Sequence, residues 1–401
     1  MTLNINDLAG TIVSASFAED RKARGRFRRA KLVALGASGS EADELLAYGC
    51  NRFVGQAVLP FPTTDEPFVP VWCDYTHEAA GRGVFPVLRE KLVQLRFPIR
   101  EGISGEEAYR AATLKGNFPD PEQTALEVID PGGLKLFLHA TPAGRIPVLT
   151  VRERSDFVVL VRALSQRNEP GPVPESMGAT MVSGLNNWDR IARYRRAWET
   201  EHPTEAATGG WPAEFSLLIP RRELYQDRLI ILSEGEYSGV AAERVGMTDE
   251  AWRAASLIIR REHEGVHYFT KRLFGSMNNA VHDELLADYA GIAAAAGSFR
   301  ADWFLLFMGL EDYPNYRWGG RLQNYLGDQQ PGARVFTILA RLIKEAAENI
   351  ELFDTRMRKA KGAAAPGLTA MLLVIAALHL EELASADAER LLGEKLSAVC
   401  R

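Results

Sequence analysis

Cysteine and long apolar runs are scarce in this chain, and each shortage removes a class of protein. The 401 residues include three cysteines, Cys50, Cys73 and Cys400, which lie far apart and without CxxC spacing. That pattern disfavours a disulfide framework and is typical of a reducing cytoplasm. The longest apolar stretch, residues 367–380, is too short to cross a bilayer and contains His379, so it predicts a buried helix. The first residues contain no continuous apolar run, so no secretory signal is indicated and we expect a cytoplasmic protein.

An excess of charge of one sign is also lacking. The chain has 47 basic and 52 acidic residues and a net charge of −5, which creates no overall field that favours nucleic acid or an anionic membrane. Residues 21–32 do contain seven basic residues in twelve, but a solvated helix face explains such a run more simply than a nucleic-acid site. We therefore expect neither nucleic acid nor a membrane as a partner, and the oligomeric state stays open.

The length and the punctuation of the chain predict an α+β protein of three regions. A chain of this length exceeds the usual size of one hydrophobic core. Residues 1–170 mix short helices with antiparallel strands, residues 171–300 carry two helices that we expect to be functional, and residues 301–401 are almost entirely helical in pattern. The proline- and glycine-rich segment 167–178 is the expected linker between the first two regions.

Apolar runs bounded by turn residues predict the strands. Residues 124–140 contain two such runs around Asp130-Pro131-Gly132-Gly133, which predicts a hairpin. Residues 145–151 are expected to add a further strand. The short runs at 215–219 and 228–233 also predict strands, and they precede the long helical region that begins near residue 248.

The stretch RREHEGVHYF, residues 260–269, contains two of the chain's seven histidines at a spacing of four. Thr248 is a good helix N-cap and Gly275 a good helix end, so the pair lies within one predicted helix. Apolar residues at three- and four-residue steps place His263 and His267 on the buried face. Two interpretations are open: a pair of core histidines that other groups hydrogen-bond, or two ligands of one metal ion.

The next predicted helix favours the metal site. It carries Glu284 and Asp288 one turn apart, on a face shared with small residues such as Gly291 and Ala295. Like charges at this spacing cost about 0.2–0.5 kcal/mol even in water, and burying them without partners costs far more. A divalent cation and an imidazole N–H would remove that cost. Glu284 is therefore the predicted third ligand, and Asp288 the predicted acceptor of the N–H of a ligand histidine.

The two segments together resemble a known class of enzyme. HEGVH, sixteen residues and then ELLAD resemble the HExxH and ExxxD motifs of the gluzincins, the thermolysin-like group of zinc metallopeptidases. The resemblance implies a zincin-like catalytic region in which zinc is bound by His263, His267 and Glu284. It also implies Glu264 as the general base and Asp288 as the residue behind a ligand histidine.

The resemblance covers about thirty residues of the chain, and the N-terminal half is not recognised from its sequence. The spacer is slightly short for the group, and Asp283 stands where the thermolysin-like pattern has asparagine. Gluzincins recruit an oxyanion donor from downstream helices. Here the loop 310–327 is rich in tyrosine and arginine, and we predict Tyr316 and Arg317 as donors. The resemblance also suggests that the strand at 228–233 aligns an extended substrate at its edge, although a plain core strand fits equally well.

These observations predict a zinc-dependent hydrolase of peptide or amide bonds. Metal-bound water would attack a carbonyl carbon while Glu264 accepts its proton. Since a peptidase without restraint is hazardous in a cytoplasm, we expect a recessed site and a small or specialised peptide or amide substrate. Two alternatives use the same residues: a non-haem iron enzyme with two histidines and one carboxylate, and a binding protein that keeps zinc for structure. Glu264 argues against the second, because a structural zinc site needs no base.

Overall fold

The structure is a computed structural model that describes residues 22–50, 60–118, 126–275, 281–327, 331–361 and 365–399. The chain divides into two compact units. The helical unit comprises Met1–Gln56 and Phe274–Arg401, and the sheet unit comprises Ala57–Leu273. A mixed sheet in one unit and an all-helical pattern in the other make the protein α+β with a mostly helical C-terminal half, so the predicted fold class is confirmed.

The two units do not coincide with the predicted regions 1–170, 171–300 and 301–401. The segment 167–178, the expected linker, lies within the sheet unit, where it joins a helix to a strand. Both ends of the chain belong to the helical unit.

The sheet unit is built on four strands in the order β1-β2-β4-β3. Strand β1 (Lys135–Thr141) pairs antiparallel with β2 (Gly144–Val151), which pairs parallel with β4 (Gln226–Ser233). Strand β3 (Ala179–Asn186) pairs antiparallel with the other side of β4. The interior strands β2 and β4 are almost entirely apolar, as strands covered on both faces are.

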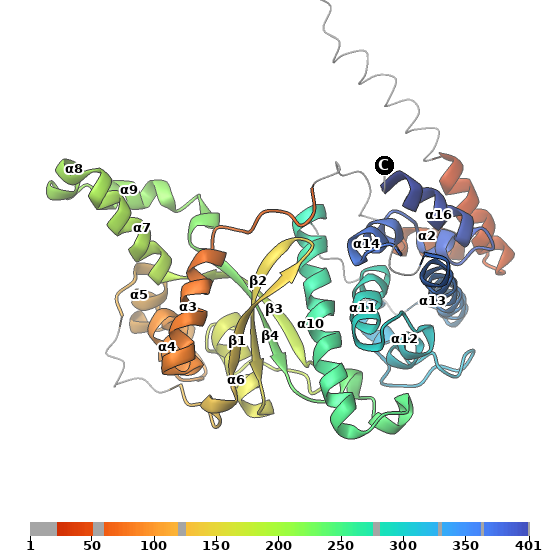
Figure 1. Ribbon diagram of the computed structural model, residues 1–401, viewed down its shortest axis with the longest axis horizontal. Coiled ribbons are helices and arrows are strands. Elements are labelled where there is room, and N and C mark those ends of the chain that lie inside the picture. The colour runs from red at the N-terminus through yellow and green to blue at the C-terminus, as the bar shows by residue number, and fades with distance from the viewer. Residues whose placement is uncertain are drawn as a thin grey trace, which may run out of the picture. The chain divides into compact units, whose positions relative to one another are not determined.

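Alternation along these strands separates two buried layers. Leu149 and Ile231 belong to the core formed with the helices on one face of the sheet, and Val148 and Ile230, on the opposite face, are also fully buried. Helices α3 and α6 cover the first face, and α10 runs along the other (Figure 1). The helices of the sheet unit are α3 (Val69–Arg82), α4 (Val84–Lys91), α5 (Glu107–Lys115), α6 (Arg154–Ser165), α7 (Trp188–Glu201), α8 (Pro203–Ala207), α9 (Trp211–Leu218) and α10 (Asp249–Phe274).

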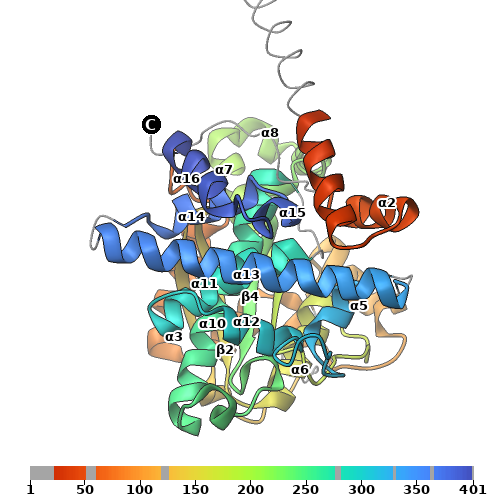
Figure 2. The same ribbon diagram turned by 90° about the vertical axis from the view of Figure 1, so that its right-hand side faces the viewer.

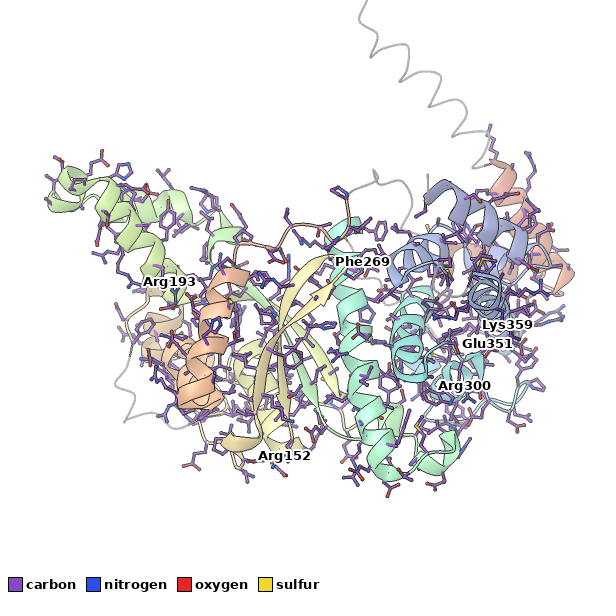
Figure 3. The ribbon with its side chains drawn as sticks, viewed as in Figure 1. Arg152, Arg193, Phe269, Arg300, Glu351 and Lys359 are labelled. Atoms are coloured by element: carbon purple, nitrogen blue, oxygen red, sulfur yellow. The ribbon has the colours of Figure 1, made fainter. Side chains whose placement is uncertain are left out.

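Helix α10 begins and ends where the sequence predicts. The Thr248 hydroxyl accepts the backbone N–H of Ala251 at 3.3 Å, and Gly275 follows the helix with a φ of +68°. On its buried side Phe269 (Figure 3) has no exposed surface and its ring lies 5.9 Å from that of Phe61. The helix is therefore fixed to the sheet unit along its length, which makes it a rigid support for the side chains it carries.

A buried carboxylate ties α3 and α7 to the sheet. Asp227 of β4 has no exposed surface and accepts hydrogen bonds from Trp72 Nε1 and Asn187 Nδ2 at 2.7 Å each. Arg190 Nη1 lies 2.5 Å from Asp227 Oδ1. Burial raises the pKa of Asp227, and Arg190 acts against that shift. In α7, Arg193 (Figure 3) also joins the two helices, because it donates to Asp74 of α3 and to Asp189 of α7.

The helical unit is arranged around one long helix. Figure 2 shows α13 crossing the unit, with α15 and α16 on one side of it and α12 on the other. The 367–380 stretch forms a helix and a turn that are largely buried, as predicted. No helix in the described part of the chain combines the length and apolar character needed to cross a membrane. The helices of the unit are residues 22–34, α2 (Gly39–Tyr48), α11 (Val281–Ala296), α12 (Ala301–Met308), α13 (Ala333–Lys361), α14 (Leu368–Ala376), α15 (Leu380–Leu383) and α16 (Ala388–Val399).

The basic run at 21–32 serves the interior of this unit. Arg28 is buried, and its Nε lies 2.9 Å from Glu381 Oε2. Arg24 donates to Glu382, also in α15, at 2.5 Å. The prediction of a solvated helix face is therefore wrong for Arg28. These pairs join the first described helix to the C-terminal helices, because each buried guanidinium needs a carboxylate.

Two predicted strand features are wrong. The hairpin turn lies at residues 142–143, between β1 and β2. Residues 131–133 form a 3-10 turn before β1, because the Asp130 side chain accepts the N–H of Gly133 at 2.9 Å and holds the turn locally. The run at 215–219 lies in and just beyond helix α9, where Phe215 stacks on Trp188 at 6.0 Å. Five apolar residues suit a strand and a helical turn equally, and packing decides between them.

The buried pair in α7 gives a stability prediction. Arg190→Met should lower the free energy of unfolding by about 3–5 kcal/mol, because it leaves Asp227 buried without its cation. Arg195→Met in the same helix is the matched control. Arg195 pairs with Glu199 at 2.6 Å with both side chains exposed, so its loss should cost at most about 0.5 kcal/mol. Urea unfolding of both variants measures the difference, and equal costs would contradict the assignment.

The helical unit should lose stability in mild acid. Burial lowers the pKa of His282 to about 4 and, with Arg28 nearby, also lowers that of His379. As pH falls from about 6.5 toward 4, the unfolded chain takes up protons that the folded chain does not, so folding stability decreases through that window. His379 Nδ1 has no hydrogen-bond partner within the described ranges. His379→Leu should therefore reduce the loss between pH 7 and pH 5 by on the order of 1 kcal/mol; an unchanged loss in urea titrations would refute this.

Candidate metal centre

The two histidines of α10 bring their ring nitrogens close together. His263 and His267 are 8% and 6% exposed, and their Nε2 atoms lie 3.0 Å apart. The rings are nearly perpendicular, with an interplanar angle of 85°. Two nitrogens bound tetrahedrally to one zinc ion lie about 3.3 Å apart, from Zn–N bonds of about 2.0–2.1 Å. The pair is therefore close to the arrangement that joint ligation requires.

A tyrosine sets the orientation of the first histidine. Tyr237 Oη lies 3.0 Å from His263 Nδ1, and the ring of Tyr237 is buried. The backbone N–H of Tyr237 donates to Ser256 Oγ at 3.0 Å, which ties the tyrosine to α10 itself. With Nδ1 engaged in this way, Nε2 is the nitrogen that faces His267. When Nδ1 carries the ring proton, the phenol oxygen accepts it and Nε2 keeps a lone pair for a metal.

Arg260 holds the turn that carries Tyr237. Its guanidinium donates to the carbonyl oxygens of Gly235 and Glu236 at 2.6 Å each. Burial lowers the pKa of Arg260 to about 10, so it remains a cation at neutral pH. Gly178 allows this approach, since a Cβ there would lie 2.3 Å from Arg260 Nε. Arg260 therefore fixes the turn that holds Tyr237, and through it the ring of His263.

Two glutamates of α10 have opposite environments. Glu264 is 8% exposed, and no hydrogen bond or ion pair joins its carboxylate to any other described residue. Glu262 instead lies 3.2 Å from His139 Nε2 and 2.8 Å from Arg261. Although burial alone would raise it, these partners hold the pKa of Glu262 below its usual range. A buried carboxylate without a partner is costly in a core and useful as a base.

The acidic residues of α11 lie in a network of their own. Glu284 and Asp288 are buried, and the 3-10 turn Arg321–Tyr325 supplies donors to both. Arg321 Nη2 lies 2.7 Å from Glu284 Oε2 and 3.2 Å from Asp288 Oδ2. Tyr325 Oη donates to Glu284 Oε2 at 2.8 Å. Burial raises the pKa of Tyr325, so the phenol keeps its proton and remains a donor.

Three residues carry the side chains that a metal site would need. His263 and His267 of the sheet unit offer two imidazole nitrogens, and Glu284 of the helical unit offers a carboxylate oxygen. Two imidazole nitrogens and one carboxylate oxygen are the donor set of catalytic zinc sites, which keep a fourth position open. The residues present therefore fit zinc by their chemistry and by the 3.0 Å separation of the two nitrogens.

The residues predicted as oxyanion donors are used within their own loop. Arg317 donates to Glu311 and to the Leu306 carbonyl at 2.5 Å, and Tyr316 donates to the Gly320 carbonyl at 2.7 Å. Gly320 allows the loop to close on the end of α12, because a Cβ there would lie 2.4 Å from a backbone oxygen. The loop thus brings Arg321 and Tyr325 to Glu284, and these contacts do not include Tyr316 or Arg317.

Two further predictions can be compared with the structure. Asp288 stays the predicted partner of a ligand histidine, and the structure adds Arg321 as its ion-pair partner. His282, two residues before Glu284, is buried with Nε2 3.2 Å from the Ile375 carbonyl. The strand at 228–233 is not an edge, since Ile230 and its neighbours pair with β2 on one side and β3 on the other. Alignment of a substrate on that strand is therefore wrong.

Sequence reasoning missed Tyr237, Arg260 and Arg321. Arg321 and Tyr325 both belong to the loop 310–327, but composition could not show which members of that loop contact Glu284 of α11. Tyr237 lies 26 residues before His263 in a turn without a motif. Arg260 lies one turn before Glu264, and this spacing is the signal that could have placed it on the same face of the helix.

A comparison with protein families gives a match that spans most of the chain. One family model matches residues 30–387, which include α10, α11 and the loop that follows α12. The chain belongs to the DUF7005 family. This family is described as one of unknown function. Comparison with curated proteins and comparison with solved structures each gave no significant match.

The role of Tyr237 in this DUF7005 protein can be tested by metal binding. Tyr237→Phe removes the acceptor for His263 Nδ1–H, and loss of such an outer partner lowers metal affinity about 10-fold or more. Competition with a chromophoric chelator measures the affinity. The control is Tyr225→Phe, since Tyr225 Oη donates to the Ile219 carbonyl at the surface. Equal affinities in the two variants would show that Tyr237 does not orient the ligand.

Proposed function

We propose that this DUF7005 protein is a zinc-dependent hydrolase of peptide or amide bonds. The observation that supports it best is the pair of Nε2 atoms of His263 and His267, which lie 3.0 Å apart, with the buried carboxylate of Glu264 next in sequence to the first ligand. The resemblance of the two motifs to the gluzincins supports the same reaction class.

Each residue has a defined task in this proposal. His263 and His267 would hold the ion through Nε2, and Glu284 would complete the set of three protein ligands. A bound zinc ion would supply an acidified water, since binding lowers the pKa of water from 15.7 toward about 7. Glu264 would accept a proton from the attacking water and donate a proton to the leaving amine. The absence of a competing partner for Glu264 among the described residues suits both steps.

The oxyanion roles predicted for Tyr316 and Arg317 are not part of this proposal. Their polar groups hold the loop after α12 through Gly320, Glu311 and a helix carbonyl. To serve as donors they would have to leave bonds that shape the loop itself, at a cost of about 1 kcal/mol or more for each bond.

The proposed substrate is a small or specialised peptide or amide. All three candidate ligands and Glu264 are less than 9% exposed, so the reacting groups are recessed from the surface. A recessed site excludes a folded protein chain and admits a short or extended substrate. Ready digestion of casein by the purified protein would contradict this restriction.

The alternative chemistries remain distinguishable. Two histidines and one carboxylate also suit non-haem iron, and a structural zinc site would use the same ligands with its fourth position closed. Metal quantification with an oxygen-uptake assay separates them: stoichiometric zinc without oxygen uptake excludes iron. Glu264 is buried and has no polar partner among the residues that the structure describes, which favours a catalytic over a structural site, because a structural site gains nothing from such a group.

The decisive variant is Glu264→Gln. It should retain the metal and lose about 10²–10⁴-fold in turnover of a peptide or amide library substrate, because the base is gone while its volume remains. Glu262→Gln in the same helix is the matched control, since Glu262 pairs with His139 and Arg261; it should keep its activity.

His263→Ala completes the test, and it should lose both the metal and the activity. If Glu264→Gln turns over every substrate as fast as the natural sequence does, Glu264 is not the base and the hydrolase mechanism is wrong. If the natural sequence binds no divalent metal at all, the whole proposal falls.

A further inference from the structure

The second oxygen of the third ligand is held from outside the metal set. Glu284 Oε2 accepts from Arg321 Nη2 at 2.7 Å and from Tyr325 Oη at 2.8 Å. Both donors come from the same 3-10 turn, Arg321–Tyr325. A carboxylate oxygen with two donors, one of them charged, is fixed in direction and its lone pairs are used.

We infer that Arg321 is a positioning residue that makes Glu284 a one-oxygen ligand and thereby selects zinc over ions of higher coordination number. The inference rests on the proposed metal centre. With Oε2 held by Arg321 and Tyr325, Oε1 is the oxygen that serves the metal. A one-oxygen carboxylate and two imidazoles suit four-coordinate zinc with one open position. Manganese prefers more oxygen ligands and an octahedral arrangement, which a two-oxygen carboxylate would help to supply.

The guanidinium N–H groups of Arg321 bond to Glu284, Asp288 and Tyr325. Nη2 reaches Glu284 and Asp288, and Nη1 lies 3.4 Å from Asp288 Oδ1. Nε donates to Tyr325 Oη at 3.1 Å, which in turn donates to Glu284. The side chain of Arg321 is 13% exposed and that of Glu284 7%. A guanidinium with this many bonds to one carboxylate pair acts on their geometry, whereas a substrate-binding arginine keeps its fork for the substrate.

Charge alone would give Arg321 the opposite effect. The cation reduces the negative charge that Glu284 and Asp288 present, so it weakens attraction to any divalent ion. Zinc and manganese carry the same charge, and this electrostatic effect therefore cancels in the ratio of their affinities. A change in the ratio of zinc to manganese affinity therefore reports the geometric effect of holding Glu284 Oε2.

The experiment measures zinc and manganese affinities of the full chain and of Arg321→Met, and records the visible absorption of the cobalt-substituted proteins. In Arg321→Met the preference for zinc over manganese should fall about 10-fold or more. The intense cobalt absorption typical of four ligands should weaken as Glu284 binds with both oxygens. Arg390→Met is the matched control, because Arg390 pairs with Glu394 at 2.8 Å with both side chains exposed; it should change neither quantity.

Two more variants keep the test sharp if Arg321→Met does not fold. Tyr325→Phe removes the second donor to Oε2 and should shift the preference in the same direction. Arg321→Lys keeps the charge but not the fork, so it should restore the preference only in part. An unchanged ratio and spectrum in Arg321→Met and in Tyr325→Phe would overturn the inference and leave the hydrolase proposal intact. Failure of the natural sequence to bind zinc, or binding that survives His263→Ala, would instead overturn the metal centre and the inference with it.

Discussion

Two carboxylates buried one helical turn apart must be compensated by positive charge, and the loop after α12 is organised by that requirement. Glu284 and Asp288 are buried in α11, where ionised groups without partners would be strongly destabilising. Arg321 supplies one cation through contacts of 2.7 and 3.2 Å. The loop after α12 is shaped to deliver it: Arg317 and Tyr316 close the loop on itself, and Gly320 lets it approach the end of the helix. Tyr316 and Arg317, whose side chains are of types common in catalytic sites, thereby help to place Arg321 and Tyr325, which contact the carboxylates.

Buried charged groups of the sheet unit are also compensated by polar partners, in two places. Asp227 is enclosed by Trp72, Asn187 and Arg190, so a carboxylate within the sheet becomes an anchor for α3 and α7. Arg260 is satisfied by backbone carbonyls and fixes the turn that carries Tyr237. Glu264 differs from these groups, because it is as buried as its neighbours and has no such partner in the described chain. Proteins retain an unpaired buried charge where it acts on something else, and this contrast within one helix supports the proposed base.

Much of the fold followed from local pattern, and its errors were also local. Helix α10 was predicted from Thr248 to Gly275 because caps and apolar periodicity act within a few residues. Strand β4 was predicted from a continuous apolar run, but its place inside the sheet was not, because pairing depends on strands far away in the sequence. The run at 215–219 became helical because Phe215 packs on Trp188. The turn at 131–133 does not join two strands, because the Asp130 side chain accepts the Gly133 N–H within it. The chain reverses later, at residues 142–143 between β1 and β2.

The sequence by itself determined the candidate ligands. Residues four apart on a helix share a face whatever the fold, so His263 with His267, and Glu284 with Asp288, could be paired from spacing and burial pattern alone. Only the tertiary structure decided what surrounds them. Tyr237 reaches His263 across 26 residues and Arg321 reaches Glu284 across 37. Contacts at such separations depend on how turns fold and which glycines permit close approach, and helical periodicity carries no information about either.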